Sequence, residues 1–192
     1  GVTRMNKIRY GLENLHIAFV NGDGTYDKPI RIPGVVGFSS TPEGSEVEFY
    51  ADNIKYYTRY ANNGYTGDIE TALFPDEVIS EMQGWEFDAN GMLVEDADGA
   101  AKEFPLLGQV QGDQANRRFI YFRCSASRPA TSHATQTENI EPTTETLNIT
   151  MMPLVVGDRK FVKGVIERNE SNATVYDNFF DAVLMPEFTV VP

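Results

Sequence analysis

Alternating apolar and polar residues form the dominant pattern of this chain, and the pattern predicts β-strands. The clearest stretch is residues 145–152, where Leu147, Ile149 and Met151 fall on one face and polar residues on the other. Successive side chains of a strand point to opposite sides, so this spacing predicts one buried face. Less regular patterns predict further strands over residues 12–20, 30–36, 45–50, 66–74 and 160–166, the second of them interrupted by Pro33 and Gly34.

Residues 104–111 and 117–126 are predicted to pair as antiparallel strands across a polar turn. Both faces of the second strand are apolar: one carries Ile120 and Phe122, the other Phe119 and Tyr121. A strand covered on both sides has this composition, so we expect residues 117–126 to lie centrally. Cys124 in the same strand is expected to be a small buried hydrophobe.

Two helices are predicted. Residues 75–83 begin with Pro, Asp and Glu, place Val78, Ile79 and Met82 on one face, and are followed by Gly84 as a natural end. Residues 174–185 follow a start similar to a capping box, with apolar residues at helical spacing. The chain is therefore predicted to be a single domain, residues 1–192, with a mainly antiparallel β-sandwich or half-barrel and one or two short helices.

Two loops stand out. Residues 88–99 are acidic and contain Asn90-Gly91, a strong signal for a two-residue hairpin turn. Residues 125–142 are dominated by Ser, Thr, Ala and Pro. Loops of this length inside compact domains are usually functional or disordered. We expect this one to become ordered only against a neighbouring molecule.

Tyrosine is concentrated in one segment. Five of the nine tyrosines fall within residues 50–65, namely Tyr50, Tyr56, Tyr57, Tyr60 and Tyr65. Tyrosine combines a large rigid contact area with one hydroxyl, which suits an interface better than a dry core. The sequence allows two interpretations of this segment, a half-exposed aromatic hairpin and a protein–protein interface.

Composition excludes several kinds of function. The net charge of −12 argues against tight nucleic-acid binding, and no apolar run reaches the length of a membrane span. One cysteine excludes an internal disulfide, and with only His16 and His133 a zinc site is not expected. EF-hand alignments on Gly91 or Gly99 lack the required glutamate. Motifs for nucleophilic or phosphate chemistry are absent, so we predict no enzyme activity and no cofactor.

A series of motifs resembles the major tail protein family of siphophages, in the branch common among phages of Gram-positive bacteria. The motifs are FYADN, YY, NNGYTGDIETAL and PDE between residues 49 and 77, NGMLVE at 90–95, GDQ at 112–114, RCSASRP at 123–129 and ETLNIT at 145–150. Each is weak alone, whereas their order and spacing are specific and cover most of the chain.

The resemblance implies a tail-tube fold and a structural virion protein of the tail, made in the host cytoplasm. Proteins of this family form hexameric rings that stack into the tube of a long non-contractile tail, which conducts DNA during ejection. The implied partners are the chain itself, a tape-measure protein, a tail terminator and distal tail proteins, with DNA passing through without specific binding.

Within this expectation, the clustering of tyrosines and the polar strand face suggest two sets of site residues. The five tyrosines are expected at subunit contacts. Asp68 and Glu70, opposite Ile69, Thr71 and Leu73 on one strand, are expected to face the lumen. A ring of six copies at −12 each carries a net charge of −72, and negative charge repels DNA phosphates. The alternative is a glycan- or surface-binding β-sandwich whose exposed tyrosines stack on sugars.

Overall fold

A large antiparallel sheet organises the computed structural model. The model describes residues 12–51, 54–110, 115–130 and 143–188, without the side chains of residues 47, 49–51 and 54–58. Seven strands follow the order β2-β1-β9-β10-β11-β6-β3, and β14 pairs with the first half of β10. Its strands are β1 (Leu12–Ile17), β2 (Ile30–Arg31), β3 (Val35–Pro42), β6 (Tyr65–Thr71), β9 (Phe104–Val110), β10 (Arg118–Ala126), β11 (Glu145–Met152) and β14 (Lys163–Ile166).

Three hairpins and two short helices complete the described chain. The hairpins are β4 (Glu46–Ala51) with β5 (Ile54–Tyr60), β7 (Glu86–Phe87) with β8 (Leu93–Val94), and β12 (Leu154–Val156) with β13 (Arg159–Phe161). The helices are α1 (Asp76–Gln83) and α2 (Ala173–Asp177). The predicted mainly antiparallel β fold with two short helices is confirmed.

β10 is central, as its two apolar faces predict. Phe119, Tyr121 and Cys124 belong to the larger core, beneath α1 and beside the inward residues of β1, β6, β9 and β11. Ile120 and Phe122 belong to a second core that the C-terminal residues cover through Phe179. The sheet therefore has apolar contacts on both faces.

Helix α1 follows its sequence signals closely. Pro75 precedes it in an extended conformation, and Gly84 ends it in the left-handed region at φ 71°. Val78, Ile79 and Met82 are buried, as predicted. The helix lies against the larger core and contacts the central strand β10.

Helix α2 is shorter than predicted. It ends at Asp177, and residues 178–182 continue as turns instead of extending the helix to residue 185. Phe179 is buried in the second core and the ring of Phe180 stacks on His16. Tertiary packing of these two rings prevails over helical periodicity. Val175, within the helix, is exposed.

Two strand predictions also need correction. The strand predicted over residues 160–166 is divided at Val162, because β13 turns back onto β12 across Gly157 whereas β14 pairs with β10. Leu73 was expected beside Ile69 and Thr71, but β6 ends at Thr71 and Leu73 is exposed.

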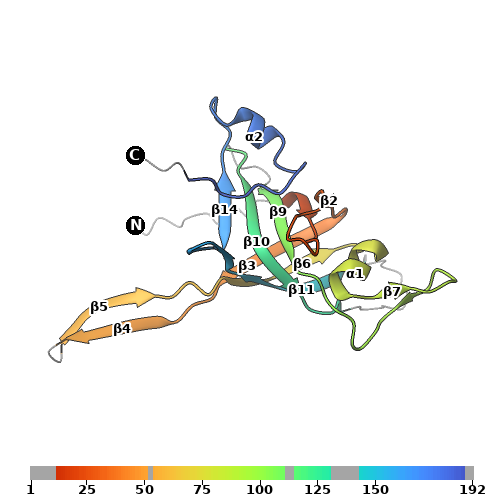
Figure 1. The fold of residues 1–192 in the computed structure, drawn as a ribbon, viewed down its shortest axis with the longest axis horizontal. Helices are drawn as coiled ribbons and strands as arrows, with labels where there is room; N and C mark the ends of the chain where they lie inside the picture. The colour runs from red at the N-terminus through yellow and green to blue at the C-terminus, as the bar shows by residue number, and fades with distance from the viewer. Residues whose placement is uncertain (1–11, 52–53, 111–114, 131–142, 189–192) are drawn as a thin grey trace, which may run out of the picture.

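Two hairpins project from the body in different directions (Figure 1). β4–β5 extends far to one side as a separate two-stranded sheet. β7–β8 points to the other side, next to α1. Its turn differs from the two-residue turn predicted at Asn90-Gly91: the Asp88 N–H donates to the Met92 carbonyl and the Gly91 N–H to the Asp88 carbonyl, so residues 89–91 form the loop with Gly91 at φ 80°. The fold is therefore a packed sheet with two protruding hairpins.

Candidate assembly surfaces

The solvent-accessible face of β3, β6 and β11 is polar, and we call it the polar sheet face. Three cross-strand rows make up this face: Thr41–Thr66–Thr150, Ser39–Asp68–Asn148 and Gly37–Glu70–Thr146. Every position is a hydroxyl, an amide, a carboxylate or glycine. The opposite face of β6 buries Ile69 in the larger core.

Asp68 and Glu70 lie two residues apart on this face, as the alternation predicts. Glu70 accepts a hydrogen bond from Thr144 Oγ1 at 2.7 Å, and the Asp68 backbone N–H donates to Ser39 Oγ at 3.3 Å. Neither carboxylate has an ion-pair partner among the described residues. The arrangement gives an acidic, hydrophilic surface.

A groove of about 730 Å³ lies along β3, where residues of both sheet faces line it. Its polar side includes Asp68, and its apolar side includes Phe38 and Tyr121. The Phe38 ring packs at 5.7 Å on Phe119 and at 6.0 Å on Tyr121, measured between ring centroids. These rings are engaged with one another and close the core beneath the groove.

The predicted tyrosines do not share one environment. Tyr60, at the end of β5, is 73% exposed. Tyr65 begins β6, and its ring packs edge-on against Tyr121 at 5.4 Å, so it contacts the chain's own core. Tyr50, Tyr56 and Tyr57 lie on β4 and β5, with side chains outside the described residues.

Cys124 has the properties of a core residue. It is fully buried, and this burial raises the pKa of its thiol, which stays protonated at neutral pH. The expectation of a buried hydrophobe is confirmed. His133 lies outside the described residues.

His16 belongs to a cluster that the sequence analysis did not identify. Its ring stacks on Phe180 at 4.5 Å, and the Arg118 guanidinium lies over Phe180 and Tyr176 at 4.7 and 4.1 Å. Burial, followed by the charges of Arg31 and Arg118, lowers the pKa of His16 despite its hydrogen bond to the Asn14 carbonyl. The cluster holds the C-terminal segment on the sheet.

The first part of the acidic loop, residues 88–92, is the turn of the β7–β8 hairpin. The Asp88 carboxylate accepts the backbone N–H groups of Asn90 and Met92, each at 2.8 Å, and these bonds lower its pKa. Within the part of the chain that the structure describes, no group of three or more His, Cys, Asp or Glu side chains could hold a metal ion. No helix among those residues could span a membrane.

Comparisons with known proteins give structural likeness alone. No protein-family model and no curated protein matches the sequence. A chain of the PVC sheath–tube complex, from an extracellular contractile injection system, is similar with TM-score 0.47 and 6% identity, covering 85% of this chain and 95% of that chain. The anti-feeding prophage tube-terminating cap gives TM-score 0.46 and 5% identity, covering 81% and 89%.

A third similar structure is Hcp1 from Flavobacterium johnsoniae, with TM-score 0.35 and 12% identity over 78% of this chain and 99% of that chain. With TM-scores below 0.5, these likenesses carry no argument about what this chain does.

Proposed function

We propose that this chain is a structural tail protein of a siphophage. It assembles into hexameric rings that stack into the tube of a long non-contractile tail, the conduit for DNA during ejection. The ordered motif series supports the family, and the β4–β5 hairpin is the observation that carries a role in assembly.

The β4–β5 hairpin needs a partner. A lone two-stranded hairpin is marginally stable in water, and its outer edges can template further pairing. Among the described strands, β4 and β5 pair only with each other, and they stand away from the body (Figure 1). The hairpin carries four of the five clustered tyrosines, which suit a contact with a neighbouring subunit.

The main sheet also ends in an edge strand that could pair with a neighbouring subunit. β3 ends the strand order, and among the described strands it pairs only with β6. Joining such edges between subunits closes a sheet into a barrel and removes exposed edges. In this arrangement the polar sheet face lines the lumen, where Asp68 and Glu70 repel DNA phosphates.

The remaining partners follow from the same proposal. A tape-measure protein occupies the lumen before ejection, while a tail terminator and distal tail proteins meet the two ends of the tube. DNA passes through without specific binding, and the assembled protein is located in the virion tail.

Glycan binding is less well supported by the geometry. Sugar recognition needs an accessible aromatic face within a pocket, but in the groove along β3 Phe119 and Tyr121 are only 7% and 1% exposed, whereas Tyr60, which is 73% exposed, lies on the β4–β5 hairpin outside that groove. Binding of soluble oligosaccharides by a persistent monomer would favour this alternative over assembly.

Electron microscopy of the purified protein over a range of concentrations tests the proposal. We expect rings or tubes that become more abundant as concentration rises. Tyr56→Ala and Tyr57→Ala should each weaken assembly, by about 1–3 kcal/mol if the residue is a hot spot, and leave subunit stability unchanged. Val175→Ala, on an exposed position of α2, is the control. A protein that stays monomeric throughout refutes the proposal.

A further inference from the structure

The β7–β8 hairpin and the residues after it are strongly acidic. Residues 86–98, called the acidic hairpin here, contain no Lys or Arg and five carboxylates, those of Glu86, Asp88, Glu95, Asp96 and Asp98. Glu95 pairs with Arg128 at 3.1 Å; the other four have no ion-pair partner among the described residues. Apolar side chains of this hairpin are also exposed: Phe87, Met92 and Val94, by 43–59%.

The segment from β12 to β14 carries the opposite charge, and its exposed basic and apolar residues are called the basic patch here. Val155 and Lys160 are cross-strand partners on β12 and β13, and Lys163 lies on β14 over the rings of Tyr65 and Tyr121. Arg159, Lys160 and Lys163 fall within five residues, and with Asp158 in the β12–β13 turn the segment 154–166 carries a net charge of +2. Lys160 and Lys163 are exposed and have no carboxylate partner among the described residues. Val155, Val156 and Val165 lie on the same strands and are 42–62% exposed.

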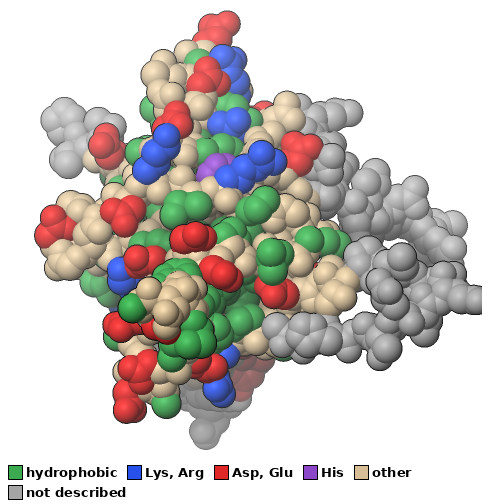
Figure 2. Space-filling model, turned by 90° about the vertical axis from the view of Figure 1, so that its right-hand side faces the viewer, with side chains coloured by type: hydrophobic (Ala, Val, Ile, Leu, Met, Phe, Trp, Pro, Cys, Tyr) green, Lys and Arg blue, Asp and Glu red, His purple; other side chains and the backbone are tan. Residues whose placement is uncertain are grey.

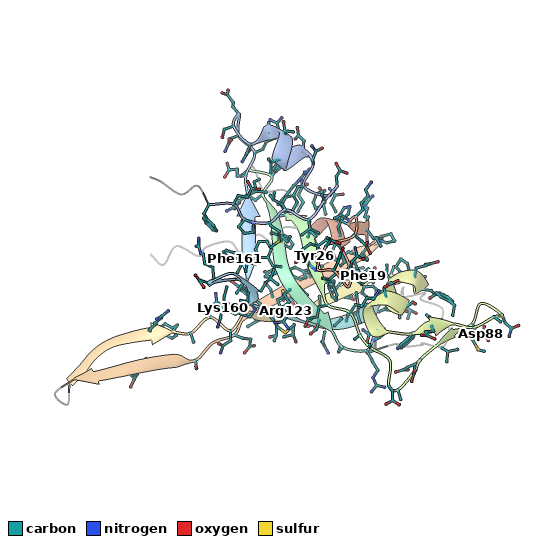
Figure 3. The ribbon with its side chains drawn as sticks, viewed as in Figure 1. Phe19, Tyr26, Asp88, Arg123, Lys160 and Phe161 are labelled. Atoms are coloured by element: carbon teal, nitrogen blue, oxygen red, sulfur yellow. The ribbon has the colours of Figure 1, made fainter. Side chains whose placement is uncertain are left out.

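The two surfaces lie on different sides of the molecule. Figure 3 places Asp88 near the far end of the β7–β8 hairpin, and Lys160 and Phe161 on the other side of the sheet. Figure 2, which looks onto the hairpin side, shows acidic side chains spread among hydrophobic ones. The acidic hairpin therefore cannot reach the basic patch of its own chain.

We propose that the acidic hairpin of one copy docks on the basic patch of the next copy. This inference rests on the proposed self-assembly and names the surfaces that make one of its contacts. Each surface combines exposed apolar area with an excess of one charge, negative on the hairpin and positive on the patch despite Asp158, so docking buries valines against Phe87, Met92 and Val94 while opposite charges meet.

The contact is heterologous, because each copy uses a different surface toward each of its two neighbours. Heterologous contacts generate closed rings when the rotation between copies closes, and otherwise open filaments. A second copy fits better than an unrelated partner, since this chain itself carries both complementary surfaces.

Charge reversal tests the contact. Lys160→Glu and Glu86→Lys each place like charges together and should lower the association constant at least about tenfold, as measured by sedimentation velocity. Both side chains are exposed, so thermal unfolding of the subunit should not change. Lys28→Glu and Glu170→Lys change the same charges at exposed positions outside both surfaces, and should assemble like the original protein.

Mixing the two variants provides the sharper measurement. In a heterologous contact, the unchanged hairpin of the Lys160→Glu chain meets the unchanged patch of the Glu86→Lys chain, and the two altered surfaces also complement each other. The mixture should therefore recover assembly that neither variant shows alone. Lys163→Glu with Asp98→Lys is the second pair, to be used if a variant of the first pair fails to fold.

The outcomes separate this contact from the proposed function. Normal assembly of both single variants, or a mixture that stays dissociated, overturns the contact while self-assembly stands. A protein with its original sequence that never assembles overturns the proposed function itself.

Discussion

Gly64 joins the projecting β4–β5 hairpin to the main sheet, and its replacement by alanine tests that joint. It lies between β5 and β6 with φ +94°, in the region that favours glycine. Its carbonyl accepts the Glu43 backbone N–H at 2.8 Å, and its own N–H donates to Asn62 Oδ1 at 3.0 Å. An added Cβ would lie 1.9 Å from the carbonyl oxygen of Met151.

Two costs combine in Gly64→Ala. The left-handed conformation costs an L-residue about 1–2 kcal/mol. The overlap adds to this cost because the obstructing atom belongs to the backbone of β11, which pairs with β6 at Met151 and Tyr65. We expect a total loss of about 3–5 kcal/mol in the free energy of unfolding, above the roughly 1–3 kcal/mol of backbone strain alone because the overlap adds to it.

Gly91→Ala is the matched control. Gly91 has φ +80°, but a Cβ there meets nothing within 4 Å, so only the conformational cost of about 1–2 kcal/mol applies. Urea unfolding of the unassembled subunit, followed by circular dichroism, gives both values. Equal losses in the two variants would show that the close approach between Gly64 and Met151 does not constrain the fold.

Phe179→Ala should cost about 3–5 kcal/mol of unfolding free energy because this ring fills the second core. Val175→Ala, at an exposed position of α2, should cost under about 1 kcal/mol. A loss at Phe179 as small as the loss at Val175 would contradict the packing of this ring. Burial holds the pKa of His16 below 6.5, so the unfolded chain binds the proton first. This contribution to stability is complete above pH 6.5 and falls on acidification toward the folded pKa, and His16→Phe should remove that slope from thermal unfolding curves between pH 7 and 5.5. Replacing Asp68 and Glu70 together by lysine should leave tubes intact and slow DNA release. The slowing should be strongest at low salt, because the Debye length is about 30 Å at 0.01 M. Unchanged ejection rates from normal tails would place both residues outside the lumen.

Local patterns predict much of this fold. Strand β11 has the predicted bounds, and Leu147, Ile149 and Met151 are buried as their alternation requires. Helix α1 is equally clear, since its start, its apolar face and Gly84 agree. Such elements follow from the sequence because each signal lies within the element itself.

Long-range packing determines the features that local patterns predict poorly. The apolar spacing after residue 174 fits a long helix, but Phe180 stacks on His16, a residue far away in the sequence. The division of the predicted strand at residues 160–166 likewise depends on β10 pairing with β14, whereas β13 pairs with β12. The cluster of His16, Arg118, Tyr176 and Phe180 has no signature in the local sequence, because its members come from separate strands and the C-terminal segment.

The exposed apolar residues have a different explanation. An alternating apolar pattern predicts that a side chain is buried. It does not distinguish burial by the chain itself from burial by a neighbouring subunit. Val155, Val156 and Val165 occupy strands of ordinary apolar composition, yet they are exposed in the single chain. Exposed apolar residues beside charges of one sign are what a subunit contact requires before its partner is present. Apolar residues that a strand pattern would bury, but that are exposed in the single chain, are therefore candidates for a subunit contact. They occur in the basic patch and in the acidic hairpin, the same two surfaces whose charges are complementary.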